Sequence, residues 1–290
     1  MKDINFYIPD FYYKNELNIL LARLIKEHPE CFYNNIKIGA IYGSFPGAIW
    51  NGGRVVLGIA LQEKIEELVK IYDDLNVPIR FTFTNCLIEK EHLNDTYCNM
   101  ILKIANNGKN EILVNSPVLE DYIRDKYPNY KILLSTTRCE RDVNKINDFS
   151  EKYHLVVPDY RDNNNFDFLK QLKHKDKIEL LVNAYCDPEC KIRAKHYELI
   201  SKDQLNFTGN SSKNMGCGTG NKSFYDILNQ NTTITDEDLY TRYVPFGFNN
   251  FKIEGRTLHN LDVIESYIYY LVPPDRKDQV RYFLIKSLWR

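Results

Sequence analysis

Short apolar runs alternate with amphipathic stretches along most of the chain. The runs are rich in Ile, Leu, Val and Phe, as is typical of strands that are covered on both faces. The runs that predict strands are 37–42, 78–84, 111–114, 131–134, 155–157, 178–182, 232–234 and 250–254. Between them, apolar residues recur at three- and four-residue steps, which predicts helices. The predicted helices are 58–75, 92–105, 118–127, 142–153, 166–172, 236–243 and 261–271.

This alternation predicts the fold class α/β, because successive βα units form a parallel sheet through right-handed crossovers. Eight such units favour a TIM-like (β/α)8 barrel of parallel strands, and an open doubly wound sheet is the alternative. We expect residues 1–274 to form a single barrel domain and residues 275–290 to form an amphipathic helix packed on it. No G-x-G-x-x-G motif or P-loop follows a predicted strand, which argues against a Rossmann dinucleotide site.

The stretch 178–197 (IELLVNAYCDPECKIRAKHY) places soft metal ligands just past the sixth predicted strand. Barrel enzymes keep their catalytic residues at such strand ends. Cys186 and Cys190 are four positions apart, so both sulfurs can face one point from a tight turn. Cys217 lies on a glycine-rich loop that can bend back toward them. Three thiolates suit an iron–sulfur cluster (4Fe-4S) or, as the alternative, zinc.

The spacing leaves the fourth metal ligand open. Cys139, just past the fourth predicted strand, is the first candidate, and His196 and Cys86 are the others. An open fourth position would let the metal bind substrate directly. The alternative is that all of these cysteines are reduced and unligated, as is common in proteins without a disulfide framework.

Polar side chains follow most of the predicted strands, and in a barrel they converge on one mouth. Those predicted to bind substrate are Ser44, Asn85, Asn115, Thr136, Asp159 and Asn183. Glu254, Arg256 and His196 are predicted to be catalytic, with Glu254 as a general acid or base. Two alternatives stay open. Lys252, Glu254 and Arg256 could form an ion-pair network that closes the barrel, and His196 could be a buried hydrogen-bonding histidine.

Composition narrows the class of protein. The chain has 290 residues, is 43% hydrophobic and carries a formal net charge of −1. With no long run of one charge sign, no strong nucleic-acid patch is expected. The first 17 residues lack an apolar signal core, and no apolar run approaches the roughly 20 residues that span a bilayer. We therefore expect a soluble, cytoplasmic protein without membrane partners, whose seven cysteines are reduced or bind metal.

The segment 247–256 (GFNNFKIEGR) resembles the G-x-x-x-(F/L)-K-I-E-G-R segment of the collagenase-like peptidase family, peptidase family U32. Upstream, 134–137 (LSTT) is similar to the family's S-T-Q strand end, and the strand before Cys186 is similar to the one before its cysteine cluster. The resemblance covers roughly residues 110–272 and implies a divergent, barrel-only member. The family includes oxygen-independent hydroxylases of tRNA, ribosomal RNA and ubiquinone precursors. These relatives carry a 4Fe-4S cluster on four cysteines, and prephenate serves some of them as oxygen donor.

Three hypotheses about function follow. The first is a cluster-dependent hydroxylase-type oxidoreductase that acts on a small molecule or RNA held at the barrel mouth. The second is a zinc-dependent peptidase or hydrolase in which Glu254 activates water. The third is a non-catalytic scaffold that pairs with a second barrel subunit. No Ser–His–Asp or papain-like Cys–His spacing is present, which counts against an ordinary hydrolase.

Overall fold

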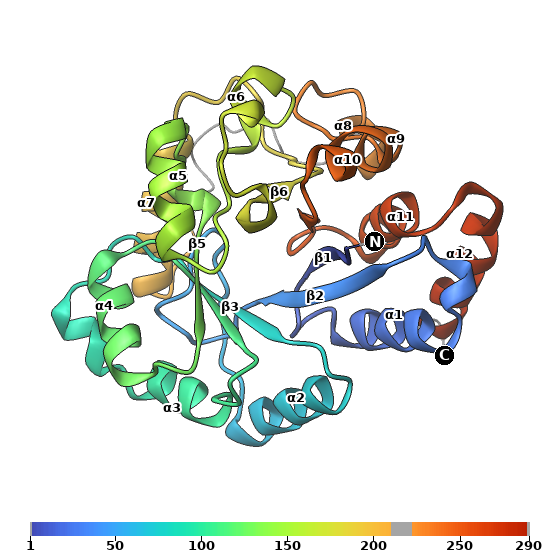
Figure 1. Cartoon of the computed structure of the whole chain (residues 1–290). Helices are drawn as coiled ribbons and strands as arrows, with labels where there is room; N and C mark the ends of the chain where they lie inside the picture. The colour runs from blue at the N-terminus through green and yellow to red at the C-terminus, as the bar shows by residue number, and fades with distance from the viewer. Residues whose placement is uncertain (1, 210–221, 289–290) are drawn as a thin grey trace.

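The computed structural model of the chain describes residues 2–209 and 222–288. Seven parallel strands form one sheet, and helices surround it (Figure 1). The strands are β1 (Ile4–Pro9), β2 (Ile36–Gly43), β3 (Ile79–Phe83), β4 (Glu111–Val114), β5 (Lys131–Leu134), β6 (Glu179–Leu181) and β7 (Asn250–Lys252). The longer helices are α1 (Asn15–Glu27), α2 (Gln62–Asp74), α3 (Thr96–Ile104), α4 (Pro117–Lys126), α5 (Val143–Lys152), α7 (Arg193–Leu205), α11 (Asn260–Leu271) and α12 (Lys277–Leu288). The short ones are α6 (Phe166–Lys170), α8 (Phe224–Ile227), α9 (Asp236–Asp238) and α10 (Val244–Phe246).

The sheet is curled, and its strand order is β5-β4-β3-β2-β1-β7-β6. Its two edges approach the segment 154–157, where Val156 forms isolated parallel bridges with Leu134 and with Ile178. The amide of Val157 also donates a hydrogen bond to the carbonyl of Leu134, and the amide of Glu179 donates one to the carbonyl of Val156. The predicted strand 155–157 therefore exists as a bridging segment, and seven strands rather than eight are present among the described residues.

Strand β1 was not among the predicted strands, although it is the centre of the sheet. Ile4 pairs with Ile36 of β2, and Asn5 pairs with Asn250 of β7. Phe6 and Ile8 are fully buried on one face, and Tyr7 is buried on the other. The signal in the sequence that could have identified this strand is the largely apolar run 4–9 (INFYIP), which is bounded by Asp3 and Asp10. By contrast, the predicted strand 232–234 is not a strand, and that prediction was wrong. Thr232 ends a turn, and the two residues after it have no regular secondary structure.

Side-chain caps explain where several helices begin. Asp95 accepts a hydrogen bond from the amide of Cys98, so α3 starts at Thr96 instead of the predicted residue 92. Ser116 caps α4 by accepting from the amide of Leu119, with Pro117 at the first helical position. Asp142 accepts from two amides at the start of α5. These caps fix the loops that lead out of the strand ends, and those loops carry the site described below.

The sheet separates two apolar layers. Its outer face packs against the helices in a large core that includes Phe6, Phe81 and Phe251. The side chains of the inner face form a second cluster, made up of Tyr7, Ala40, Tyr42, Leu113, Leu133, Leu155 and Val157. Because Leu155 and Val157 come from the bridging segment, this inner cluster is enclosed by the sheet and by 154–157 together. The inner space is therefore filled with side chains.

A buried cluster of charges also lies within the curled sheet. Arg80, which is 0% exposed, donates hydrogen bonds to Glu111 (2.7 Å) and Glu179 (2.5 Å). The Lys252 Nζ lies 3.5 Å from a carboxylate oxygen of Glu179. The guanidinium of Arg80 stacks on the ring of Tyr7 at 3.8 Å. Charges this deeply buried persist because each has a partner of opposite sign.

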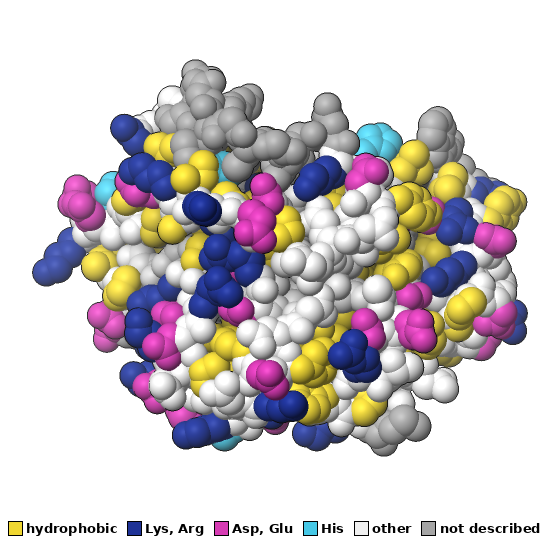
Figure 2. Space-filling model, turned by 90° about the horizontal axis from the view of Figure 1, so that it is seen from above, with side chains coloured by type: hydrophobic (Ala, Val, Ile, Leu, Met, Phe, Trp, Pro, Cys, Tyr) yellow, Lys and Arg dark blue, Asp and Glu magenta, His cyan; other side chains and the backbone are white. Residues whose placement is uncertain are grey.

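The C-terminal helix α12 packs against α1 and α11, as Figure 1 shows, and its Val280 and Leu284 are buried. On the face seen in Figure 2, Lys and Arg side chains are interspersed with Asp and Glu. Within residues 2–209 and 222–288, no helix combines the length and the apolar character needed to cross a bilayer.

Candidate functional site

A small cavity of about 60 Å³ opens at the carboxyl ends of the strands. Its walls come from β2, β3, β4, β6 and β7, from the segments that follow these strands and β5, and from α7. Its charged lining residues are Arg54, Arg193, Lys252, Glu254 and Arg256. Tyr42, Tyr160 and Tyr197 supply aromatic walls, and Cys186 supplies a thiol. We refer to this space as the inner cavity.

A wider hollow of about 880 Å³ lies outside the inner cavity and shares Arg54, Cys186 and Glu254 with it. We call it the outer hollow. His196 and Asp262 are among its other lining residues. The two spaces meet at the three shared residues, so the side chains of Arg54 and Glu254 lie between the outer hollow and the inner cavity.

Glu254 is held by contacts at both of its carboxylate oxygens. Arg54 forms an ion pair with Oε1, and the amide of Tyr185 donates a hydrogen bond to Oε2 at 3.2 Å. Asn183 fixes the backbone of Glu254, because its side chain accepts from the Glu254 amide (2.6 Å) and donates to the Glu254 carbonyl (3.1 Å). The carboxylate is thus oriented by a cation and a backbone donor. The acid–base role of Glu254 stays a prediction.

Arg256 is positioned by neutral oxygen atoms. It donates to Thr82 Oγ1 (2.9 Å), to Asn51 Oδ1 (3.4 Å) and to the carbonyl of Gly52 (3.1 Å). No carboxylate in the described residues lies within ion-pair distance of it. Burial lowers the pKa of its guanidinium, because desolvation disfavours the charged form. Gly255 brings this segment against β1, since a Cβ there would lie 2.8 Å from Pro9.

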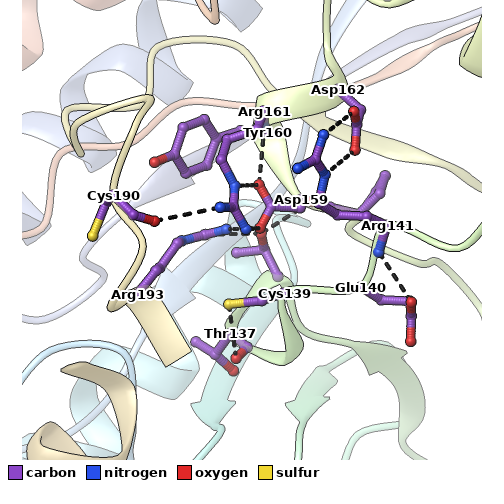
Figure 3. A network of polar contacts seen from close by, with 12 residues as sticks. Thr137, Cys139, Glu140, Arg141, Asp159, Tyr160, Arg161, Asp162, Cys190 and Arg193 are labelled. Carbon is purple, nitrogen blue, oxygen red and sulfur yellow. Dashed lines mark hydrogen bonds and ion pairs between the residues drawn. The ribbon is translucent and has the colours of Figure 1, made fainter. Parts of the chain in front are cut away.

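Asp159 forms ion pairs with two arginines, Arg161 and Arg193, which Figure 3 shows from close by. Arg161 contacts both of its oxygens, at 2.9 and 2.8 Å, and Arg193 donates to Oδ2 at 2.5 Å. Although burial raises the pKa of Asp159, the bonds from Arg161 and the charge of Arg193 outweigh it and hold that pKa below its usual range. Arg193 also donates to Thr136 Oγ1 and lies over the ring of Tyr160, which fixes it at the cavity wall.

Of the six predicted substrate-binding residues, Thr136 lines the inner cavity and Asp159 holds Arg193 behind its wall. The other four make structural contacts. The hydroxyl of Ser44 donates to the carbonyl of Phe45, and Asn85 donates to the carbonyls of Ile49 and Ser201. Asn115 donates to Thr137 Oγ1, and Asn183 holds Glu254. The predicted residues do lie near the strand ends that border the inner cavity, but most of them hold the surrounding loops in place and do not line the cavity.

The predicted metal ligands are only partly gathered. Cys186 lines the inner cavity, and its thiol pKa is raised by burial and by Glu254. Cys139 has left-handed backbone (φ 54°), and its Sγ lies 3.6 Å from the carbonyl of Thr137. Cys190 contributes its carbonyl to Arg161 Nη1 at 3.4 Å. Cys217 lies outside the described residues. Within the described part of the chain, no three His, Cys, Asp or Glu side chains are grouped to hold a metal.

His196 lies on α7 and borders the outer hollow, so it is not grouped with Arg256 in the inner cavity. Its pKa is lowered by burial and by the nearby charge of Arg54. The structure therefore places Glu254 and Arg256 around the inner cavity, and His196 beside Glu254 in the outer hollow.

Three basic lining residues were not predicted as site residues from the sequence. Arg54 follows a Gly-Gly pair in the loop after β2, and Arg193 is the first residue of α7. Lys252 ends β7 and lies 3.9 Å from the ring centre of Tyr42. Burial lowers the pKa of Lys252 to about 8. The Gly-Gly-Arg sequence just past a strand was the available signal for Arg54.

No protein family and no curated protein matches the sequence of the chain. Among solved structures, the U32 peptidase Mk0906 is similar in fold, with a TM-score of 0.54 and 13% sequence identity. That similarity covers 88% of this chain and 94% of the peptidase. A GH113 β-1,4-mannanase aligns over 98% of both chains at 10% identity, with a TM-score of 0.39. The chain thus has the curled, parallel α/β fold of a U32 peptidase.

Proposed function

We propose that this chain is an enzyme of the collagenase-like peptidase (U32) family and that the inner cavity is its active centre. The observation that carries the proposal is the position of the family-like segment. Lys252, Glu254 and Arg256 of that segment line one cavity together with Cys186, which follows the second family-like strand. Residues from two distant parts of the sequence thus meet at the strand ends, where barrel enzymes keep their catalytic groups.

We further propose that the scaffold is a closed eightfold barrel in which the segment 154–157 takes the place of the eighth strand. The bridges from Val156 to Leu134 and Ile178 support this reading. So does the inner cluster, to which Leu155 and Val157 contribute side chains. A closed barrel gives the cavity a rigid floor, because the inward side chains are packed in layers below it.

The reaction that we propose is oxygen-independent hydroxylation of a small molecule, with a 4Fe-4S cluster as cofactor. A second organic molecule donates its hydroxyl oxygen to the substrate carbon, and it is itself reduced by the two electrons that the substrate loses. The family resemblance and the place of Cys186 support it. Cys139, Cys186 and Cys190 do not by themselves make a cluster site, so a cluster here would also depend on Cys217. Such a cluster would supply redox or Lewis-acid chemistry at the cavity. The chain's own residues would then orient the substrate, with Glu254 holding Arg54 at the entrance.

The size of the cavity favours a small molecule over RNA. Its volume is about 60 Å³, which admits a small chemical group. A group of a few atoms can enter it, and the remainder of a small substrate would lie in the outer hollow.

The cofactor proposal is tested by iron and sulfide content and by the visible spectrum of anaerobically purified protein. We expect about four irons per chain with matching sulfide and absorbance near 400 nm. Both should be lost in Cys186→Ala and kept in Cys31→Ala, since Cys31 is buried beside α1, away from the cavity. Iron retained in Cys186→Ala, or its absence from the wild type, would contradict the proposal.

Peptide hydrolysis is the second candidate, because the solved structure of similar fold is a peptidase. It predicts bound zinc and chelator-sensitive cleavage of peptides, measured by mass spectrometry. Activity lost in Glu254→Gln and kept in Glu265→Gln would favour it over hydroxylation, because Glu265 pairs with Arg281 away from the cavity. A protein without metal and without turnover that binds a second barrel chain would favour the scaffold alternative.

A further inference from the structure

The inner cavity has an excess of positive charge. Four of its lining side chains are basic, namely Arg54, Arg193, Lys252 and Arg256, and Glu254 is the one acidic residue among those that line it. Two of the arginines are already paired, Arg54 with Glu254 and Arg193 with Asp159. Lys252 lies near Glu179. Arg256 remains with neutral oxygen partners only, within the described residues.

A second observation points to a ligand at the same place. Thr84 lines the cavity and is 3% exposed, yet its hydroxyl has no hydrogen-bond partner in the structure. A buried hydroxyl without a partner loses its bonds to water and gains none in return, so such groups are uncommon in folded proteins. The Thr84 hydroxyl therefore lacks a hydrogen-bond partner, which a bound ligand can supply.

Gly53 shows that Arg256 and Thr84 border one space. A Cβ atom on Gly53 would lie 3.0 Å from Nη2 of Arg256 and 3.8 Å from Oγ1 of Thr84. The φ angle of Gly53 is +74°, a conformation that side chains other than glycine rarely adopt. Because residue 53 has no side chain, it leaves uncovered the sides of the guanidinium and the hydroxyl that face it, and both of these groups can donate hydrogen bonds to oxygen.

We propose that this end of the inner cavity is an oxyanion subsite that takes the carboxylate or phosphate group of the substrate, held by Arg256 and Thr84. Arginine binds both kinds of group with two parallel hydrogen bonds, and the surrounding positive charge adds to the attraction. The proposal deepens the proposed function, on which it rests, by naming the substrate class as a small acid or a phosphate ester. The ion pair of Arg54 with Glu254 lines the same cavity.

The test measures binding of acetate, malonate and inorganic phosphate by calorimetry at low ionic strength. We compare the wild type with Thr84→Val, Arg256→Gln and Thr232→Val. Thr232 is the matched control, because its hydroxyl is also buried (2% exposed) and without a partner but does not line the inner cavity. We expect Thr84→Val to weaken binding about five- to tenfold and Arg256→Gln to weaken it at least about tenfold. Thr232→Val should leave it unchanged.

Unfolding in urea separates this role from a structural one. Thr84→Val removes an unpartnered hydroxyl, so stability should stay the same or rise even as binding weakens. Stronger binding of malonate or acetate would identify a carboxylate, and stronger binding of phosphate a phosphate ester. Binding that is equal in all four proteins, or absent for all three anions, would overturn the subsite. Because anion binding needs no cluster and no turnover, its result does not depend on the iron analysis. The subsite can therefore be confirmed when the cluster is absent, and it can be overturned when the cluster is present.

Discussion

Glu254 and Arg54 form an ion pair across the mouth of the sheet, although 200 positions separate them in the sequence. Arg54 comes from the loop after β2, and Glu254 lies two residues past β7. Both residues line the inner cavity and the outer hollow. The pair therefore sets the charge where the two spaces meet, beside Cys186, and it gives Glu254 a role that does not require proton transfer.

Replacing Glu254 by Gln should tighten anion binding in the inner cavity by about fivefold. The change removes the one carboxylate that lines the cavity and releases Arg54 from its partner, and both effects favour an anion. Calorimetry with malonate or phosphate measures the effect. Glu265→Gln is the control, since Glu265 pairs with Arg281 elsewhere. Weaker binding in Glu254→Gln would show that Glu254 positions Arg54 for the anion rather than competing with it.

Arg80→Met should destabilise the fold by about 3–5 kcal/mol. The substitution leaves Glu111 buried without its cation and leaves Glu179 with only Lys252. The free energy of unfolding in urea measures the loss. Arg124→Met is the control, because its pair with Glu120 lies on the surface and should contribute less than about 1 kcal/mol. Equal losses in the two variants would contradict the assignment of Arg80, Glu111 and Glu179 as a buried charge network.

Lys252 should titrate near pH 8, well below its ordinary value of 10.5, because burial disfavours the ammonium form. The Cε chemical shift of labelled lysine followed against pH would show this. Between pH 8 and 10.5 the folded chain has lost this proton while the unfolded chain keeps it. The folded state therefore gains stability as the pH rises from 8 to 10.5, because the cost of burying the charged amine disappears. This gain is fully present above pH 10.5 and is lost as the pH falls through 8.

The neighbouring carboxylate provides a check on that titration. Glu179 raises the pKa of Lys252, so Glu179→Gln should lower it further. Glu111→Gln should have a smaller effect, because Glu111 is paired with Arg80 and not with Lys252. A Lys252 titration above pH 10 in the wild type would mean that water reaches the inner cavity and solvates the amine.

Asp159→Asn should remove an acid-sensitive part of the stability. The pKa of Asp159 is held below its usual value of 3.8, so its contribution is present above pH 3.8 and is lost as the pH falls through the folded pKa. At neutral pH the variant should be about 3–5 kcal/mol less stable, since Arg193 is left buried without its carboxylate. Urea unfolding at pH 7 and at pH 3 measures both effects, and the difference between the two proteins should shrink at pH 3.

The sequence determined the class of fold because apolar runs and amphipathic stretches depend on local residue order. Six of the eight predicted strands overlap strands of the sheet, and 155–157 is the bridging segment. The place of the mouth also followed, because polar residues after parallel strands must lie at one edge. β1 was missed even though its residues alternate between buried faces, and 232–234 has no strand despite its β-branched residues.

Only the tertiary structure decided which of those polar residues face the cavity. Asn183 and Glu254 are both strand-end residues, yet Asn183 bonds to backbone while Glu254 reaches the mouth. Three basic residues are held by carboxylates that are distant in the sequence. Arg54 pairs with Glu254, 200 positions away, Arg193 with Asp159, 34 positions away, and Lys252 with Glu179, 73 positions away. Charge pairing, burial and the unpartnered hydroxyl of Thr84 arise from packing between distant segments. Local sequence patterns carry information on neighbours along the chain, and these properties depend on neighbours in space.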